Sequence, residues 1–350
     1  MEKARFKWVL RERNRKIAAK TEVFTEQQAR RVRSFHSSFK EYSPTPLIEL
    51  TSLAQHLGIK NLFVKDESYR FELNAFKVLG GSFAIGSYIA NELGEDIDDL
   101  PYMRLVSDEV RSLLGSKTFI TTTDGNHGRG VAWTANRLKQ QAIVYMPQGS
   151  AAERLANIRA EGAQAEITDM NYDDTVRYTS ELAQKNGWII VQDTAWDGYT
   201  RIPLWIMQGY MTMALEAYEQ LPVKPTHIFL QAGVGSLAGS VQGFFADIYG
   251  SSCPLTFIVE PKGADCLYQT AAANDGSLHS VTGRLETIMA GLACGEPNSI
   301  AWEILGNLSD GFISCPDYTA AQGMRILGNP LAGDTKVSAG ESGAATPGAA

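Results

Sequence analysis

A single lysine stands among apolar residues just before a pair of glycines. Lys77 follows Phe76 and precedes Val78 and Leu79, and the glycines occupy positions 80–81. Burial among such neighbours disfavours the ammonium form and lowers the pKa of the amine, which makes it a usable nucleophile. A lysine in this setting can also extend its charged end to water from an amphipathic helix. The segment alone leaves both interpretations open.

A glycine-rich segment far downstream could bind a phosphate. It lies between an apolar run and an expected helix, and its central residues are Gly233, Val234, Gly235 and Ser236. Glycines let the backbone approach an anion, and a helix start offers N–H groups and a favourable dipole. The same glycines also fit a tight turn or the dinucleotide fingerprint, with Glu260 about twenty residues further on. A nucleophilic amine together with a phosphate-binding loop is what pyridoxal phosphate (PLP) requires.

Residues 121–130 form a third candidate segment, between an expected strand and an expected helix. Backbone N–H groups at such a helix start could hold a substrate carboxylate. The amide of Asn126 could bond to a hydroxyl group of a cofactor. Asp124 is either the N-cap of the helix or an acid–base group, and the sequence leaves both open.

Asp193 is a second carboxylate, placed directly after the strand expected at 188–191. Open α/β sheets keep their ligand sites at the carboxyl ends of their strands. Two carboxylates at such a site would bind an amine-bearing substrate and transfer protons. Aromatic residues that follow are expected to pack in the core or in a dimer contact: Trp196, Tyr199, Trp205 and Tyr210.

Short apolar runs alternate with helical patterns along most of the chain. This alternation predicts an α/β fold with a mainly parallel sheet and helices on both faces. The expected strands lie at 62–65, 118–122, 142–146, 165–168, 188–191, 227–230 and 256–259. Helices are expected between most of them, for example over 151–162 and 173–186, and the basic first forty residues are expected to be helical.

Composition limits the class of protein. The 350 residues suffice for two domains, and 44% hydrophobic with 20% charged residues is typical of a globular chain. A net charge of −7 argues against a nucleic-acid partner. The sequence contains neither an apolar run of about 18 residues nor the apolar core of a secretory signal, so no membrane partner and a cytoplasmic location are expected.

The cysteines and histidines do not predict a metal site. The four cysteines are Cys253, Cys266, Cys294 and Cys315. Neither they nor the five histidines show the spacing of metal ligands. We expect the cysteines to be reduced thiols.

Together these segments resemble the PLP enzymes of fold type II, the tryptophan-synthase-β group. The resemblance implies that Lys77 forms the Schiff base with the cofactor and that Asn126 contacts the side that carries the 3-hydroxyl group. It implies a phosphate loop at Gly233, Val234, Gly235 and Ser236. It implies a substrate-binding set made of Thr122, Thr123, Gly125 and His127.

Longer stretches are similar to the diaminopropionate ammonia-lyase family. They are TTDGNHGRG at 122–130, DMNYDDT at 169–175, QDTAW at 192–196 and MAGLACGEP at 289–297. The resemblance extends from about Phe24 to about Ala344. Dehydratases of this fold usually have a serine before the G-N-H triplet, whereas this chain has Asp124.

The resemblance implies a PLP-dependent α,β-elimination that converts D- and L-2,3-diaminopropionate to pyruvate and two ammonia. Lys77 would take the α-proton of one isomer, and Asp124, on the opposite face, that of the other. Asp193 would hold the second amino group of the substrate. Cys266 and Cys294 both lie in family-like segments, so the resemblance also admits a pair near the site.

The resemblance also implies two doubly wound open-sheet α/β domains with the active site in the cleft between them. The large PLP-binding domain would combine 1–85 with 198–350, and the small domain would span 86–197. The family continues after the stretch that matches 341–344, so we expect a shortened C-terminal end that lacks the group facing the pyridine nitrogen. A homodimer is expected by analogy.

Three other functions remain open at this point. A serine or threonine dehydratase of the same fold would release pyruvate or its homologue from a hydroxyamino acid. A catalytically silent protein would bind PLP without turnover. A nicotinamide-dependent dehydrogenase would use the glycine loop at 233–238 for a dinucleotide.

Overall fold

The computed structural model describes residues 6–13, 21–123 and 125–349, and these residues form two compact units. The first unit contains residues up to 25, residues 44–74 and residues 213–350. The second unit contains residues 26–43 and 75–212. These boundaries differ from the expected ones at 85/86 and 197/198, and the packing within the second unit gives the reason.

A parallel four-stranded sheet forms the centre of the second unit, with strand order β6-β5-β4-β7. Its strands are β4 (Thr118–Thr122), β5 (Gln141–Met146), β6 (Gln164–Ile167) and β7 (Ile189–Ile190). Its helices are α1 (Glu26–Ser37), α3 (Lys77–Leu93), α4 (Tyr102–Leu105), α5 (Asp108–Leu114), α6 (Asn126–Arg137), α7 (Ala152–Ala160), α8 (Tyr172–Asn186) and the first part of α9 (Arg201–Gln220).

Glycines bring three helices of the second unit into backbone contact. A Cβ at Gly130 of α6 would lie 2.9 Å from the Cα atom of Val78 in α3. A Cβ at Gly209 of α9 would lie 2.3 Å from the carbonyl oxygen of Leu79. Because α6 and α9 both pack this closely against α3, the whole of α3 belongs to the second unit.

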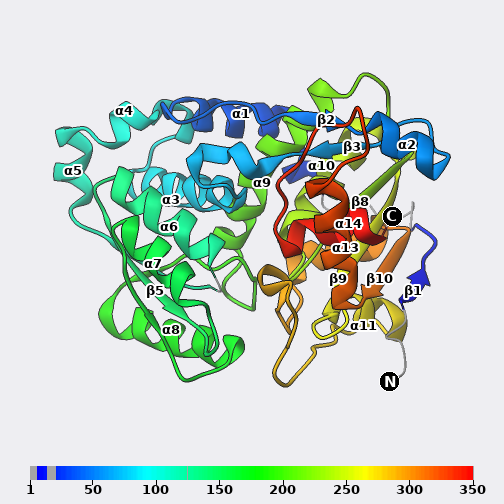
Figure 1. Cartoon of the computed structure of the whole chain (residues 1–350). Coiled ribbons are helices and arrows are strands. Elements are labelled where there is room, and N and C mark those ends of the chain that lie inside the picture. The colour runs from blue at the N-terminus through cyan, green and yellow to red at the C-terminus, as the bar shows by residue number, and fades with distance from the viewer. Residues whose placement is uncertain (1–5, 14–20, 124, 350) are drawn as a thin grey trace. The chain divides into compact units, whose positions relative to one another are not determined.

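The first unit is built around a second four-stranded sheet, with order β1-β10-β9-β8. Strands β8 (His227–Gln231), β9 (Leu255–Pro261) and β10 (Gly311–Cys315) are parallel, and β1 (Lys7–Leu10) is antiparallel to β10. Strands β2 (Leu47–Glu49) and β3 (Phe63–Lys65) form a separate antiparallel pair. The helices are α2 (Thr51–Leu57), α10 (Ser236–Tyr249), α11 (Cys266–Ala273), α12 (Ser299–Leu308), α13 (Asp317–Gly328) and α14 (Glu341–Ala349), and Figure 1 shows α13 and α14 beside β8 and β9.

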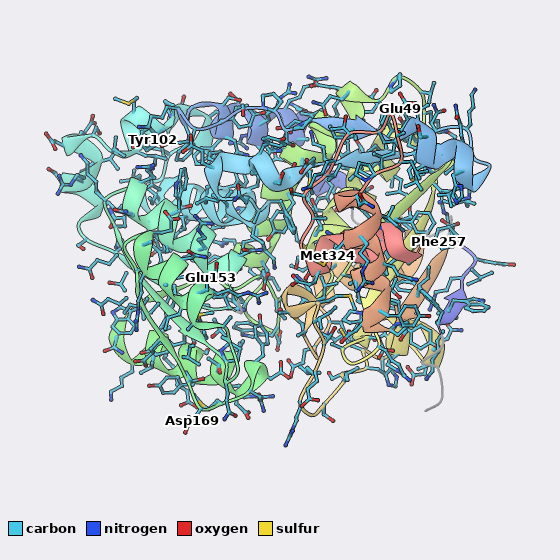
Figure 2. The ribbon with its side chains drawn as sticks, in the orientation of Figure 1. Glu49, Tyr102, Glu153, Asp169, Phe257 and Met324 are labelled. Carbon is cyan, nitrogen blue, oxygen red and sulfur yellow. The ribbon has the colours of Figure 1, made fainter. Side chains whose placement is uncertain are left out.

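Helices α13 and α14 pack through small residues. A Cβ at Gly323 would lie 1.9 Å from the carbonyl oxygen of Ala344, and one at Gly348 would lie 2.1 Å from that of Thr319. Both helices contribute to a buried cluster that contains Val259, Met289, Leu292, Cys315, Ala320 and Ala345. On the same sheet, the ring of Phe257, labelled in Figure 2, stacks on that of Phe229 with centroids 5.3 Å apart.

The predicted α/β class with two domains is confirmed, and every expected strand has a counterpart. Three strands were not predicted: β1, β2 and β10. The helical prediction for the first forty residues is wrong at Lys7–Leu10, where the backbone pairs with β10 instead. Within the described residues, none of the helices is both long enough and apolar enough to cross a membrane.

Candidate active site

Lys77 is the first residue of α3, and its amine contacts a carboxylate of the same unit. The Nζ atom donates to Oδ2 of Asp193 at 2.5 Å, and the two side chains are 21% and 5% exposed. Burial by itself opposes the charge on Asp193, but Lys77 and His127 outweigh it and lower the pKa of Asp193 to about 2. The structure thus brings two of the three predicted catalytic residues into direct contact.

The chain enters α3 through an unusual backbone. Phe71, Glu72 and Asn74 have φ values of 50°, 60° and 57°. This left-handed region is costly for residues other than glycine and persists only where the surroundings enforce it. The segment just before Lys77 is therefore held in shape by its contacts rather than by local preference.

The loop after β4 is held by its own side chains. Thr123 accepts a hydrogen bond at Oγ1 from the N–H of Gly125 at 2.9 Å, and a Cβ at Gly128 would lie 2.3 Å from the Cγ2 atom of Thr123. Asn126 begins α6 and is exposed, so its amide can reach a ligand. Asp124, the third predicted catalytic residue, lies outside the described residues.

Two of the predicted substrate-binding residues, Thr122 and His127, form hydrogen bonds that fix the backbone of the site. The N–H of Thr122 donates to Oε1 of Gln192 at 3.0 Å, and its hydroxyl lies 2.8 Å from that of Thr179. His127 is buried, and its Nε2 lies 2.7 Å from the carbonyl oxygen of Val191, which makes that nitrogen the donor. These bonds tie β4 and α6 to the segment that carries Asp193.

The glycine loop of the first unit begins after β8 and leads into α10. Gly235 has a φ of 100°, which favours glycine, and Ser236 is the first helical residue. Asn298 donates from Nδ2 to the hydroxyl of Ser236 at 2.8 Å, and its N–H donates to the carbonyl of Val234 at the same distance. The loop has the open backbone and helix start that an anion requires.

Asn298 was not recognised from the sequence. It also caps α12, where its Oδ1 accepts from the N–H groups of Ile300 and Ala301 at 2.9 and 3.3 Å. An asparagine before a helical pattern is a usual N-cap signal. Its second role depends on α12 packing against α10, which the sequence pattern does not reveal.

The structure argues against the dinucleotide interpretation of this loop. Glu260 is fully buried, and its carboxylate accepts from the N–H groups of Leu267 and Tyr268 at 2.9 and 2.7 Å. It therefore caps α11 and is not presented to a ribose. Burial raises the pKa of Glu260 well above its ordinary value.

Two cysteines lie beside the glycine loop. The Sγ atom of Cys266 lies 3.9 Å from the carbonyl oxygen of Gly233, and a Cβ at Gly233 would lie 3.2 Å from the Sγ atom of Cys294. All four cysteines are free thiols in the structure. Among the described residues there is also no group of three or more histidine, cysteine or acidic side chains that could hold a metal ion.

Each of the two units contains residues that suit one part of PLP. A partly buried lysine at a helix start offers its amine to an aldehyde, and a glycine loop at a second helix start offers N–H groups to a phosphate. A Cβ at Gly233 would lie 3.2 Å from both Leu292 and Cys294, and Gly235 has a positive φ, so both positions of the loop favour glycine.

Comparisons with known proteins agree with this site. Residues 39–350 match the family described as "Pyridoxal-phosphate dependent enzyme". Diaminopropionate ammonia-lyase from Escherichia coli (strain K12) is 52% identical over 326 residues, which cover 92% of this chain and 80% of the relative.

Solved structures of the Escherichia coli enzyme are similar as well. The selenomethionine holo form has a TM-score of 0.91 at 49% identity, covering 99% of this chain and 86% of that chain. The complex with the aminoacrylate-PLP azomethine reaction intermediate has a TM-score of 0.89 at 49% identity, covering 99% and 85%. The chain therefore belongs to the diaminopropionate ammonia-lyases among the pyridoxal-phosphate-dependent enzymes, and it is a lyase that uses this cofactor.

Proposed function

We propose that this enzyme converts D- and L-2,3-diaminopropionate to pyruvate and two ammonia by α,β-elimination. The observation that carries the proposal is the contact between Lys77 and Asp193. It places an amine that can leave its charged partner beside a carboxylate that is ionised while the two are paired, since the charges of Lys77 and His127 lower the pKa of Asp193 to about 2. Such a carboxylate can exchange the lysine ammonium for a substrate ammonium.

We assign the residues that hold the cofactor as follows. Lys77 binds its aldehyde carbon, and Asn126 contacts the side with the 3-hydroxyl group. The phosphate group is held by Gly233, Val234, Gly235 and Ser236. When bound, the cofactor withdraws electrons from the α-carbon of the substrate.

The remaining residues bind the substrate or move its protons. The carboxylate of the substrate is held at the loop made of Thr122, Thr123, Gly125 and His127, in which Thr122 and His127 act mainly by fixing the loop. Asp193 holds the second amino group and orients it for departure. Lys77 and Asp124 take the α-proton from opposite faces, one for each isomer.

The experiment for this reaction measures both products. Borohydride treatment of the holoenzyme should leave a reduced pyridoxyl group on Lys77, located by peptide mass spectrometry. The enzyme should then release two ammonia per pyruvate from diaminopropionate and turn over serine much more slowly. Pyruvate from serine at an equal kcat/KM would favour the dehydratase, and an adduct without turnover of either amino acid would indicate a silent PLP-binding protein.

Asp124→Ala tests the scheme with two bases. The variant should lose turnover of one isomer far more than of the other, because the base on the opposite face remains. Separate assays of the D and L substrates measure the two losses. Equal losses for both isomers would refute the assignment of Asp124.

We further propose a cytoplasmic homodimer that binds neither nucleic acid nor membranes. The acidic pI of about 5.4 supports the absence of a nucleic-acid partner, and the assembly is proposed by analogy with the family. Light scattering coupled to gel filtration should give twice the chain mass of 38.2 kDa.

A further inference from the structure

Tyr210 in α9 carries a buried hydroxyl that none of the described residues bonds. The side chain is 0% exposed, and its oxygen has no hydrogen-bond partner within residues 6–13, 21–123 and 125–349. A buried polar group without a partner is rare, because its desolvation is not compensated. We therefore expect this hydroxyl to find a hydrogen-bond acceptor in another state of the site.

The surrounding helices hold the phenol end of Tyr210 against the first turn of α3. A Cβ at Gly80 would lie 2.7 Å from Cε1 and 2.8 Å from Cζ of Tyr210, so only glycine leaves room for the ring. The ring of Phe76 meets it edge-on, with centroids 5.1 Å apart. These neighbours hold the hydroxyl in the turn that begins at Lys77.

Two charged residues of the active site affect the pKa of this hydroxyl. Burial raises the pKa of Tyr210, the charge of Lys77 lowers it, and the charge of Asp193 raises it. The net shift is upward, so the phenol stays protonated throughout the working range. Tyr210 is thus a permanent neutral donor whose ring packs against the turn that begins at the lysine of the ion pair.

Tyr199 provides the contrast within the same unit. It is also buried near Asp193, and burial raises its pKa. Its hydroxyl, however, accepts from the N–H of Gln192 at 2.8 Å and donates to the carbonyl of Ile190 at 2.9 Å. The hydroxyl of Tyr199 is therefore a fixed structural link, whereas that of Tyr210 is available.

We propose that Tyr210 is a positioning residue that replaces Lys77 as the hydrogen-bond donor to Asp193 while the lysine is bonded to the cofactor. The proposal rests on the function proposed above. The Lys77 ammonium first loses a proton, and its two remaining hydrogens leave with the aldehyde oxygen as water when the carbon–nitrogen double bond forms. Asp193 then lacks its lysine donor, and the Tyr210 hydroxyl keeps the carboxylate ionised and oriented until the substrate ammonium arrives.

A double-mutant cycle on the cofactor-free full chain tests the exchange without measuring activity. Tyr210→Phe should leave the Tm unchanged or slightly higher while Lys77 is present, because it removes only an unbonded hydroxyl. In the Lys77→Met background, the same substitution should lower the Tm by about 2–4 °C, because Tyr210 is then the donor to Asp193. Tyr199→Phe is the matched control and should lower the Tm equally in both backgrounds. Equal effects of Tyr210→Phe in the two backgrounds would overturn the proposal.

The loaded enzyme gives a second measurement that does not need the Lys77 variant. Tyr210→Phe should lower kcat about tenfold with little change in KM, and the acid limb of the kcat profile should move to higher pH, because Asp193 without its donor protonates more easily. A wild-type kcat and pH profile would overturn the proposal. Borohydride trapping on the wild-type enzyme separates the two claims: no adduct on Lys77 refutes the proposed function, whatever the Tm cycle shows.

Discussion

Lys77–Asp193 and Arg70–Glu216 are both ion pairs with a buried carboxylate, one in each compact unit, but their charges have different surroundings. Arg70 is 0% exposed and bonds to both oxygens of Glu216, at 2.9 and 2.7 Å. It also donates to both oxygens of Glu67 at 2.8 Å and to the hydroxyl of Thr45 at 3.1 Å. The Lys77 side chain, by contrast, is 21% exposed, and its Nζ atom lies 2.5 Å from Oδ2 of Asp193.

The difference separates a structural charge from a reactive one. A guanidinium cannot lose its proton in a protein, and carboxylates on several sides hold that of Arg70 in one geometry. An ammonium can lose its proton and leave its partner, as a nucleophile must. Arg70 directly precedes the left-handed backbone of Phe71 and Glu72, so its bonds also hold the segment that leads to Lys77.

Removing the reactive charge should abolish the chemistry and spare the fold. We expect Lys77→Ala to lower kcat on the order of 10⁴-fold, because the covalent attachment of the cofactor is lost. The Tm of the cofactor-free chain should change by only a few degrees. Pyruvate release and thermal unfolding measure the two effects, and a variant that keeps a tenth of the activity would contradict the role of Lys77.

Removing the structural charge of Arg70 should instead lower the stability of the fold. Arg70→Met should lower the free energy of unfolding by about 3–5 kcal/mol, because it leaves the buried carboxylate of Glu216 without its main partner. Urea unfolding of the cofactor-free chain measures the change. In the control, Arg70→Met combined with Glu216→Leu should recover much of the loss, and a double variant as unstable as the single one would rule out an unpaired charge as the cause.

A fall in pH should weaken the Arg70–Glu216 pair within a defined pH range. Burial opposes the charge of Glu216, but Arg70 and Lys65 prevail and lower its pKa from 4.5 to about 2. The unfolded chain therefore binds more protons than the folded one below about pH 4.5, so the stability from this pair is complete above that pH and is lost as the pH falls towards 2. Urea midpoints measured from pH 6 to 3 should fall less steeply in Glu216→Gln than in the wild type, and parallel curves would contradict the assignment.

Removing an uncharged contact at the glycine loop, that of Asn298, should have the smallest effect on stability. Asn298→Ala should lower the free energy of unfolding by about 1 kcal/mol, because α12 loses its N-cap. It should also weaken PLP binding by several-fold, because the hydroxyl of Ser236 loses the side-chain donor that fixes it. Asn298→Asp is the control that keeps the cap but removes the donor to Ser236, and it should lower PLP affinity without loss of stability.

The predictions that succeeded rest on local signals. Apolar runs bounded by polar residues identified the parallel strands from β4 to β9, since a strand in a parallel sheet is covered on both faces. The same signal identified β3, which pairs with β2 in an antiparallel manner. The unpredicted β1 is a short strand whose Trp8 and Leu10 are 66% and 70% exposed, so its place follows from pairing with β10 and not from burial. The prediction that the first forty residues are helical failed at these positions for that reason.

The sequence by itself determined which residues carry the chemistry: a lysine before two glycines, acidic residues after strands and a glycine loop before a helix. Each of these signals lies within a few neighbouring positions. Only the tertiary structure decided that Asp193 faces Lys77, that Glu260 caps a helix and that the hydroxyl of Tyr210 remains unbonded among the described residues. Such facts depend on side chains that are distant in the chain, and their desolvation and pairing exist only once the helices and strands have packed.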